Sequence, residues 1–224
     1  LGNAYKELGK LSEAVDSYNH ALEHNEDYPD SLNNLGTVLH ELGKFDEAII
    51  NFEKLLLIDP NHIDANYNAA IVQKDMGRLD DALISYQKII ELDSNNAEVH
   101  NNLGNIYKDL NQLDDALKSF NRAIEIKPKF AEAYNNLGNL YIDFIKVDDA
   151  IDCYKRAIDI DPSFIEAHNN IGNVFKDIGK TDEAINSYKK AIELKYDFAE
   201  AHNNLGAAYK DLNNFNEALN SFEN

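Results

Sequence analysis

The feature that most constrains this chain is a step of 34 residues at which the same residue types return. A small residue recurs at this step: Gly2, Gly36, Ala70, Gly104, Gly138, Gly172 and Gly206. An alanine series keeps the step: Ala14, Ala48, Ala82, Ala116, Ala150, Ala184 and Ala218. So does an aromatic series: Tyr18, Phe52, Tyr86, Phe120, Tyr154, Tyr188 and Phe222. A fixed period of this length indicates an array of stacked supersecondary units.

The repeat boundaries follow from this register. Complete repeats are predicted at 29–62, 63–96, 97–130, 131–164 and 165–198, with partial repeats at 1–28 and 199–224. Below, residues 29, 63, 97, 131, 165 and 199 each occupy position 1 of a repeat. We expect a single array over 1–224 that is a segment of a longer protein, because neither end carries the polar capping unit that such arrays need.

Each repeat reads as two helices joined by a turn. In 97–130, apolar residues recur at helical spacing from Val99 to Leu110 and again from Ala116 to Ile124. The predicted turn residue is Asn111, where four other repeats carry glycine, which suits a helix end with positive φ. Ile145 occupies this place in 131–164, and we expect its turn to differ because a β-branched residue disfavours positive φ.

The second helices are predicted to start at a residue type that favours N-caps. These residues are Ser12, Asp46, Asp80, Asp114, Asp148, Asp182 and Asn216.

The motif residues of repeat 97–130 are Leu103, Gly104, Tyr107, Ala116, Phe120 and Pro128. At this period they resemble the tetratricopeptide repeat, and the resemblance covers the whole chain. It implies an all-α fold, a right-handed α-solenoid of helix-turn-helix repeats. It also implies that the first helices line a concave groove that binds peptides or protein segments. Long tetratricopeptide arrays resembling that of protein O-GlcNAc transferase carry an asparagine ladder, which position 6 matches here.

Position 6 is asparagine in every repeat that contains it: Asn34, Asn68, Asn102, Asn136, Asn170 and Asn204. A carboxamide can bind a peptide unit without reading its side chain, so we predict that this ladder binds an extended backbone. The neighbouring asparagines at positions 9 and 5 are added to the predicted site: Asn105, Asn139, Asn173, Asn101, Asn135 and Asn169. The alternative is that these residues bridge adjacent helices.

Two further predictions concern the same face. Acidic residues at position 13 indicate an acidic groove for basic segments, with solvated surface charge as the alternative: Glu41, Asp75, Asp109, Asp143, Asp177 and Asp211. Tyr67 and Ile71 depart from the pattern of positions 5 and 9. They predict an apolar pocket for one ligand side chain, with sequence drift of this repeat as the alternative.

Net charge and the absence of known motifs exclude several classes of partner and activity. A net charge of −19 argues against nucleic acid and anionic membrane as partners. Cys153 is the sole cysteine, and no signal peptide or membrane span is visible, so we expect a cytoplasmic protein. No catalytic motif occurs and no cofactor is expected. His100, His168 and His202 fall one per repeat, which favours interhelical contacts over a metal site.

The sequence therefore predicts a scaffold that binds basic or neutral protein segments in an acidic, asparagine-lined groove. Two alternatives stay open. The array could recruit substrates for an attached protein-modifying enzyme, a glycosyltransferase like O-GlcNAc transferase or a sulfotransferase. It could also be a scaffold that self-associates end to end.

Overall fold

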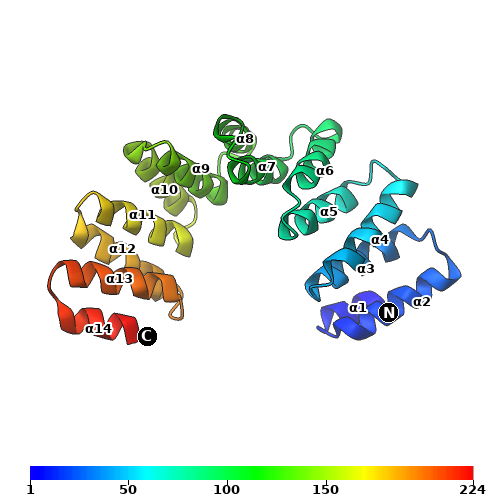
Figure 1. Cartoon of the computed structure of the whole chain (residues 1–224), viewed down its shortest axis with the longest axis horizontal. Coiled ribbons are helices and arrows are strands. Elements are labelled where there is room, and N and C mark those ends of the chain that lie inside the picture. The colour runs from blue at the N-terminus through cyan, green and yellow to red at the C-terminus, as the bar shows by residue number, and fades with distance from the viewer. Residues whose placement is uncertain (224) are drawn as a thin grey trace. The chain divides into compact units, whose positions relative to one another are not determined.

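The computed structural model describes residues 1–223, which form fourteen α-helices and no strand (Figure 1). The first helices of the repeats are α1 (Gly2–Glu7), α3 (Pro29–Glu41), α5 (Ile63–Asp75), α7 (Ala97–Asp109), α9 (Ala131–Asp143), α11 (Ile165–Asp177) and α13 (Ala199–Asp211). The second helices are α2 (Leu11–His24), α4 (Phe45–Ile58), α6 (Leu79–Leu92), α8 (Leu113–Ile126), α10 (Val147–Ile160), α12 (Thr181–Leu194) and α14 (Phe215–Glu223). The predicted all-α helical-repeat fold is confirmed.

The helices form two compact units, Leu1–Gln112 with α1 to α7 and Leu113–Asn224 with α8 to α14. The boundary between the units falls inside the predicted repeat 97–130. Within each unit every helix packs against the next one along the chain. Successive first helices also contact each other, namely α3 with α5, α9 with α11, and α11 with α13. This second contact brings the equivalent positions of neighbouring repeats side by side.

In five repeats the glycine of the first helix lies directly against the aromatic ring of its own repeat: Gly2, Gly36, Gly138, Gly172 and Gly206. A Cβ on Gly138 would lie 2.7 Å from a ring carbon of Tyr154, and a Cβ on Gly172 would lie 2.6 Å from Tyr188. Both rings are buried, so in these repeats the first helix meets the second helix through ring-to-backbone contact. The glycine allows the close approach of the two helices.

The turns between the two helices of a repeat share one geometry. The expectation that the turn at Ile145 differs was wrong. Gly43 has a φ of +73°, its N–H donates to the carbonyl of His40, and the Lys44 N–H donates to Leu39. Ile145 adopts the same left-handed conformation, with a φ of +59°. Its N–H donates to Ile142 over 2.9 Å, as the common turn requires. The two closing bonds hold the turn in shape although isoleucine is a poor residue for it.

The N-caps lie two residues before the predicted ones in five second helices. The second helices begin one residue before the predicted caps, and no cap side-chain bond is present at Lys10, Lys44, Arg78, Lys146 or Lys180. The aspartates instead lie in the first helical turn, as Asp46 does in α4. A carboxylate there interacts favourably with the positive end of the helix dipole, which accounts for the acidic preference.

Candidate functional site

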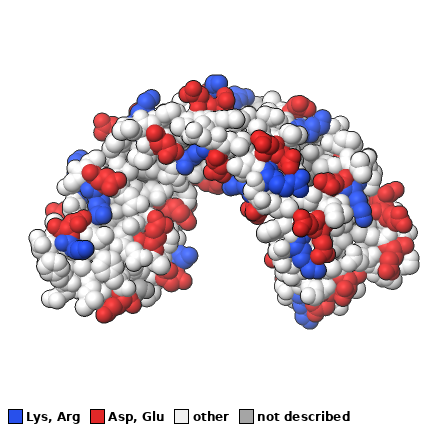
Figure 2. Space-filling view, viewed as in Figure 1, with Lys and Arg blue, Asp and Glu red and all other residues white. Residues whose placement is uncertain are grey.

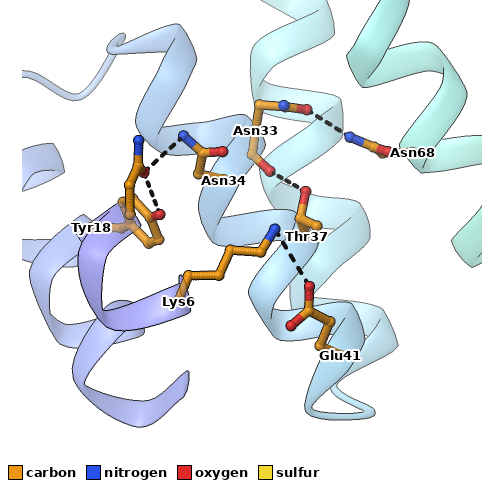
Figure 3. A network of polar contacts seen from close by, with 8 residues as sticks. Lys6, Tyr18, Asn33, Asn34, Thr37, Glu41 and Asn68 are labelled. Atoms are coloured by element: carbon orange, nitrogen blue, oxygen red, sulfur yellow. Dashed lines mark hydrogen bonds and ion pairs between the residues drawn. The ribbon is translucent and has the colours of Figure 1, made fainter. Parts of the chain in front are cut away.

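The position-6 asparagines bind the preceding repeat. Nδ2 of Asn68 donates to Oδ1 of Asn33 over 3.1 Å in the first unit (Figure 3). In the second unit, Nδ2 of Asn170 donates to Asn135 and Nδ2 of Asn204 to Asn169, both over 3.0 Å. Each acceptor occupies position 5 of the preceding repeat. The structure therefore shows the bridging role that was the alternative to ligand binding, and this role occupies one end of the carboxamide.

The position-9 asparagines collect hydrogen bonds from both sides. Oδ1 of Asn139 accepts a hydrogen bond from the hydroxyl of Tyr154 over 2.7 Å and another from Nδ2 of Asn170 over 3.3 Å. In the first unit, Oδ1 of Asn3 likewise accepts hydrogen bonds from the Tyr18 hydroxyl and from Nδ2 of Asn34. The position-9 side chain thus links the second helix of its own repeat to the first helix of the next.

The other predicted position-9 residues make fewer bonds. Asn173 accepts the hydroxyl of Tyr188 over 2.8 Å. Asn105 makes no side-chain hydrogen bond within the described residues, and the aromatic residue of its repeat is Phe120, which has no hydroxyl. A position-9 asparagine accepts a hydrogen bond from the second helix where the aromatic residue of its repeat is a tyrosine.

The three position-5 asparagines of the predicted site are buried in this conformation. Asn101, Asn135 and Asn169 are 1%, 5% and 1% exposed. Asn169 both accepts from Asn204 and donates to the Glu200 carboxylate over 2.8 Å. Asn135 and Asn169 lie on the side of the helix that the next repeat of their unit covers. Contact of the three residues with a peptide stays a prediction.

Tyr67 takes over the role of the missing position-5 asparagine. Its hydroxyl accepts a hydrogen bond from Nδ2 of Asn102 over 3.2 Å. Its ring packs edge-on against the ring of Tyr86, with 5.8 Å between the ring centroids. Both Tyr67 and Ile71 are half-buried. These contacts account for Tyr67 within the fold, and the apolar pocket at Tyr67 and Ile71 stays a prediction.

The position-13 acids are partly neutralised by the preceding repeat. Lys6 contacts Glu41 over 3.4 Å (Figure 3), His40 contacts Asp75 over 2.7 Å, and Lys176 contacts Asp211 over 3.8 Å. The three partners, two lysines and one histidine, all occupy position 12. Figure 2 likewise shows Lys and Arg side chains scattered among the Asp and Glu side chains on the visible surface.

Two position-13 acids lack such a partner. Asp109 and Asp177 form no ion pair with Lys or Arg in the described residues. For Asp177 the reason is visible, since the preceding repeat carries Ile142 at position 12, and this side chain is 39% exposed. Uncompensated negative charge is therefore local rather than continuous along the first helices.

The face formed by positions 6, 9 and 13 of the first helices is named the asparagine face. In both units it is half-buried at position 6 and exposed at position 13. The Oδ1 atoms of five position-6 residues accept no hydrogen bond from the described part of the chain: Asn34, Asn68, Asn102, Asn170 and Asn204. The face thus offers hydrogen-bond acceptors and single carboxylates, which suit N–H donors and cations.

The histidines at position 4 bind the preceding turn. Nε2 of His100, His168 and His202 donates to the carbonyl oxygens of Ser94, Pro162 and Tyr196 over 3.1, 3.0 and 2.7 Å. Asn66 makes the equivalent bond to Pro60. This role was missed at the level of the sequence, although its signal is present, because the four side chains share an N–H donor at one repeat position. No group of metal-ligating side chains occurs among residues 1–223.

Two further observations concern reactivity and membranes. Burial raises the pKa of the Cys153 thiol to about 12, so this cysteine is protonated at neutral pH. None of the helices within residues 1–223 combines the length and the apolar character needed to cross a bilayer.

Comparison with family models identifies the repeat. A model described as TPR repeat matches residues 2–43, 72–111, 104–143, 146–179 and 172–213. Models described as tetratricopeptide repeat match residues 29–62 and 130–160. Comparison with curated protein sequences gives no match.

Solved structures show the same architecture. The chain is 31% identical to MamA, covering 77% of this chain and 94% of that one with a TM-score of 0.64. It is 20% identical to a tetratricopeptide repeat protein from Parabacteroides merdae, with coverages of 99% and 88% and a TM-score of 0.83. It is 22% identical to YrrB, a TPR protein with an unusual peptide-binding site, with coverages of 84% and 96% and a TM-score of 0.61.

Proposed function

We propose that this chain, which belongs to the tetratricopeptide repeat family, holds an extended protein segment on its asparagine face. Membership of the family makes the chain a protein-interaction scaffold, and its fold is typical of non-catalytic proteins. The proposal adds where the segment binds and which groups recognise it. It rests on one observation, the Oδ1 atoms of Asn34, Asn68, Asn102, Asn170 and Asn204, which accept no hydrogen bond from the described part of the chain.

The bridging bonds support the proposal because they orient the carboxamides. Nδ2 of Asn170 is held by Asn135 and Asn139, so its Oδ1 has a fixed direction. A preorganised acceptor loses little conformational entropy when a ligand binds. Repetition of this acceptor on successive first helices suits a ligand with regularly spaced donors, and the N–H groups of an extended backbone are such donors. The bridging and binding roles are therefore compatible, since they use opposite ends of one side chain.

Charge gives the proposed face a preference among ligands. Asp177 has no cationic partner and lies one helical turn beyond Asn173 on the same face. A Lys or Arg side chain of a bound segment gains attraction there, whereas Asp or Glu is repelled. The position-13 acids with an ion pair contribute less, because their charge is already compensated. The proposed ligand is therefore an extended segment with a few basic residues rather than a highly cationic one.

The relative YrrB supports this type of function. It is a TPR protein with a peptide-binding site, and its fold matches that of this chain. We extend peptide binding to this chain on the basis of the shared fold and of the acceptors described above.

The test compares an extended peptide with its charge-reversed twin. A peptide of about a dozen residues, mostly Thr with two or three Lys, is long enough to pass several first helices. Its twin carries Glu in place of Lys. We expect the Lys peptide to bind more tightly by fluorescence anisotropy, and the difference to shrink with added salt. Equal affinities, or tighter binding of the Glu twin, would contradict the proposed charge preference.

A further inference from the structure

An exposed apolar stripe runs along α4 in the first unit. Ile50 is 50% exposed and Leu57 is 85% exposed, and they are seven residues apart, so they share one face of the helix. The adjoining residue Ile58 is 43% exposed. Glu53 and Lys54 lie between Ile50 and Leu57 on this face, so the apolar surface is concentrated at Leu57 and Ile58. Exposed apolar surface is typical of interaction sites when the fold does not require it.

The repeats themselves show that the fold does not require this stripe. Leu57 occupies position 29, where the other repeats carry an acidic residue: Glu23, Glu91, Glu125, Asp159 and Glu193. Ile50 occupies position 22, which holds a polar or charged residue in five other repeats: Asp16, Lys118, Asp152, Asn186 and Asn220. The same helix forms with polar residues at both positions. A role outside the fold of this helix is therefore needed to account for Leu57.

Leu57 also lines a groove of about 890 Å³ between α2 and α4. The apolar part of the lining comes from Leu22, Leu32, Leu57 and Ile58. Leu22 and Leu32 belong to the hydrophobic core, so the groove gives access to the edge of that core.

The rim of this groove is acidic. Glu23, Glu26 and Asp27 line it from α2 and the following loop, and Lys54 is its only basic lining residue among those described. Glu26 and Asp27 form no ion pair in the described part of the chain, so their charge is available to a ligand. An apolar floor with an acidic rim is complementary to a segment that has apolar residues flanked by Lys or Arg.

We propose that this groove and the Ile50–Leu57 stripe bind a basic amphipathic helix of a partner protein. The apolar residues of that helix cover Leu57 and Ile50, which lie about 10 Å apart along α4, the rise of two helical turns. Its Lys or Arg residues face Glu26 and Asp27. A second copy of this chain is a poor occupant, because each copy carries a net charge of −19. This surface uses α2 and α4 and is independent of the asparagine face on the first helices.

The test uses a model peptide and two matched variants. The probe is an amphipathic helical peptide of about 18 residues, with a Leu stripe bordered by Lys, and its twin carries Glu in place of Lys. Leu57→Gln removes the apolar contact in the groove. Ile84→Gln is the control, because Ile84 is 65% exposed, also occupies position 22, and lies outside the groove. Thermal melting of both variants checks that each is folded.

We expect the Lys peptide to bind the unaltered chain, and Leu57→Gln to weaken it about tenfold or more. Ile84→Gln should leave the affinity unchanged, and the Glu twin should bind about tenfold more weakly. No binding of the Lys peptide up to about 1 mM, or equal loss in both variants, would overturn the proposal. Light scattering that shows dimers lost in Leu57→Gln would overturn it too, since the occupant would be a second copy.

Discussion

Nδ2 of Asn204 donates a hydrogen bond to Oδ1 of Asn169 over 3.0 Å, and Asn169 is only 1% exposed. This bond joins the first helices of two repeats at a polar group that water does not reach. Asn68 and Asn170 donate the equivalent hydrogen bond in their own repeats. The asparagines therefore join neighbouring repeats as well as lining a surface. A variant that removes them tests both roles at once, and the two roles need separate measurements.

The first prediction concerns stability. Asn204→Ala should lower the free energy of unfolding by about 1–3 kcal/mol, because it leaves the buried Oδ1 of Asn169 without its donor. Urea unfolding followed by circular dichroism measures the change. Asn186→Ala is the control, since Asn186 is exposed on α12 and its side chain makes no hydrogen bond in the described residues. Equal stability of the two variants would show that the bridge contributes nothing.

The second prediction concerns the turn after α9. Ile145→Gly should raise the free energy of unfolding by about 1 kcal/mol, because glycine adopts a φ of +59° without the clash of a β-branched side chain. Ile145 is 85% exposed, so little packing is lost. Ile145→Val keeps the β-branch and should leave stability unchanged. A loss of stability in the glycine variant would mean that this turn is not strained.

The third prediction concerns the contact between the two helices of a repeat. Gly172→Val should destabilise the second unit by about 1–3 kcal/mol or more, because its side chain would overlap the ring of Tyr188. Gly172→Ala should cost less, since Ala70 occupies the same repeat position beside Tyr86. Thermal melting of the two variants gives the order. A valine variant that melts at the unaltered temperature would contradict the ring-to-backbone contact.

The sequence predicted the repeat register and the helix pairs because both depend on spacing within one repeat. It did not predict which side chains meet between repeats. An asparagine can donate or accept in many directions, and the partner of Asn102 is Tyr67, a residue type that no repeat rule assigns to that role. The burial of Asn169 also depends on the next repeat, which intrahelical periodicity does not report.

Ile145 illustrates a different limit. Residue preference predicted a distorted turn, but the turn is closed by bonds of its neighbours, including Lys146 N–H to the carbonyl of Tyr141. The preference of one residue is outweighed by two backbone bonds and by the packing of α9 against α10. Local propensity fails where the surrounding structure imposes the conformation.

The fourth prediction concerns Asp177, a position-13 acid that forms no ion pair with the preceding repeat in the described residues. Ile142→Lys should supply the cation that Asp177 lacks, because Ile142 holds the position that Lys176 holds before Asp211. We expect a basic peptide to bind this variant several-fold more weakly, since the carboxylate is then compensated. Ile84→Lys is the control, because it adds the same charge at an exposed residue of a second helix, outside the asparagine face. Equal weakening in both variants would indicate a general charge effect.

The most direct test of the central claim changes the ligand and leaves the protein intact. In an ester twin of the Lys-Thr peptide, oxygen replaces several backbone N–H groups while the charges stay the same. If the ligand backbone donates to the position-6 Oδ1 atoms, the ester twin loses about 0.5–1.5 kcal/mol for each missing bond. Fluorescence anisotropy should then show that the ester twin binds about tenfold or more weakly. Equal affinities for the two peptides would contradict a backbone-binding asparagine face.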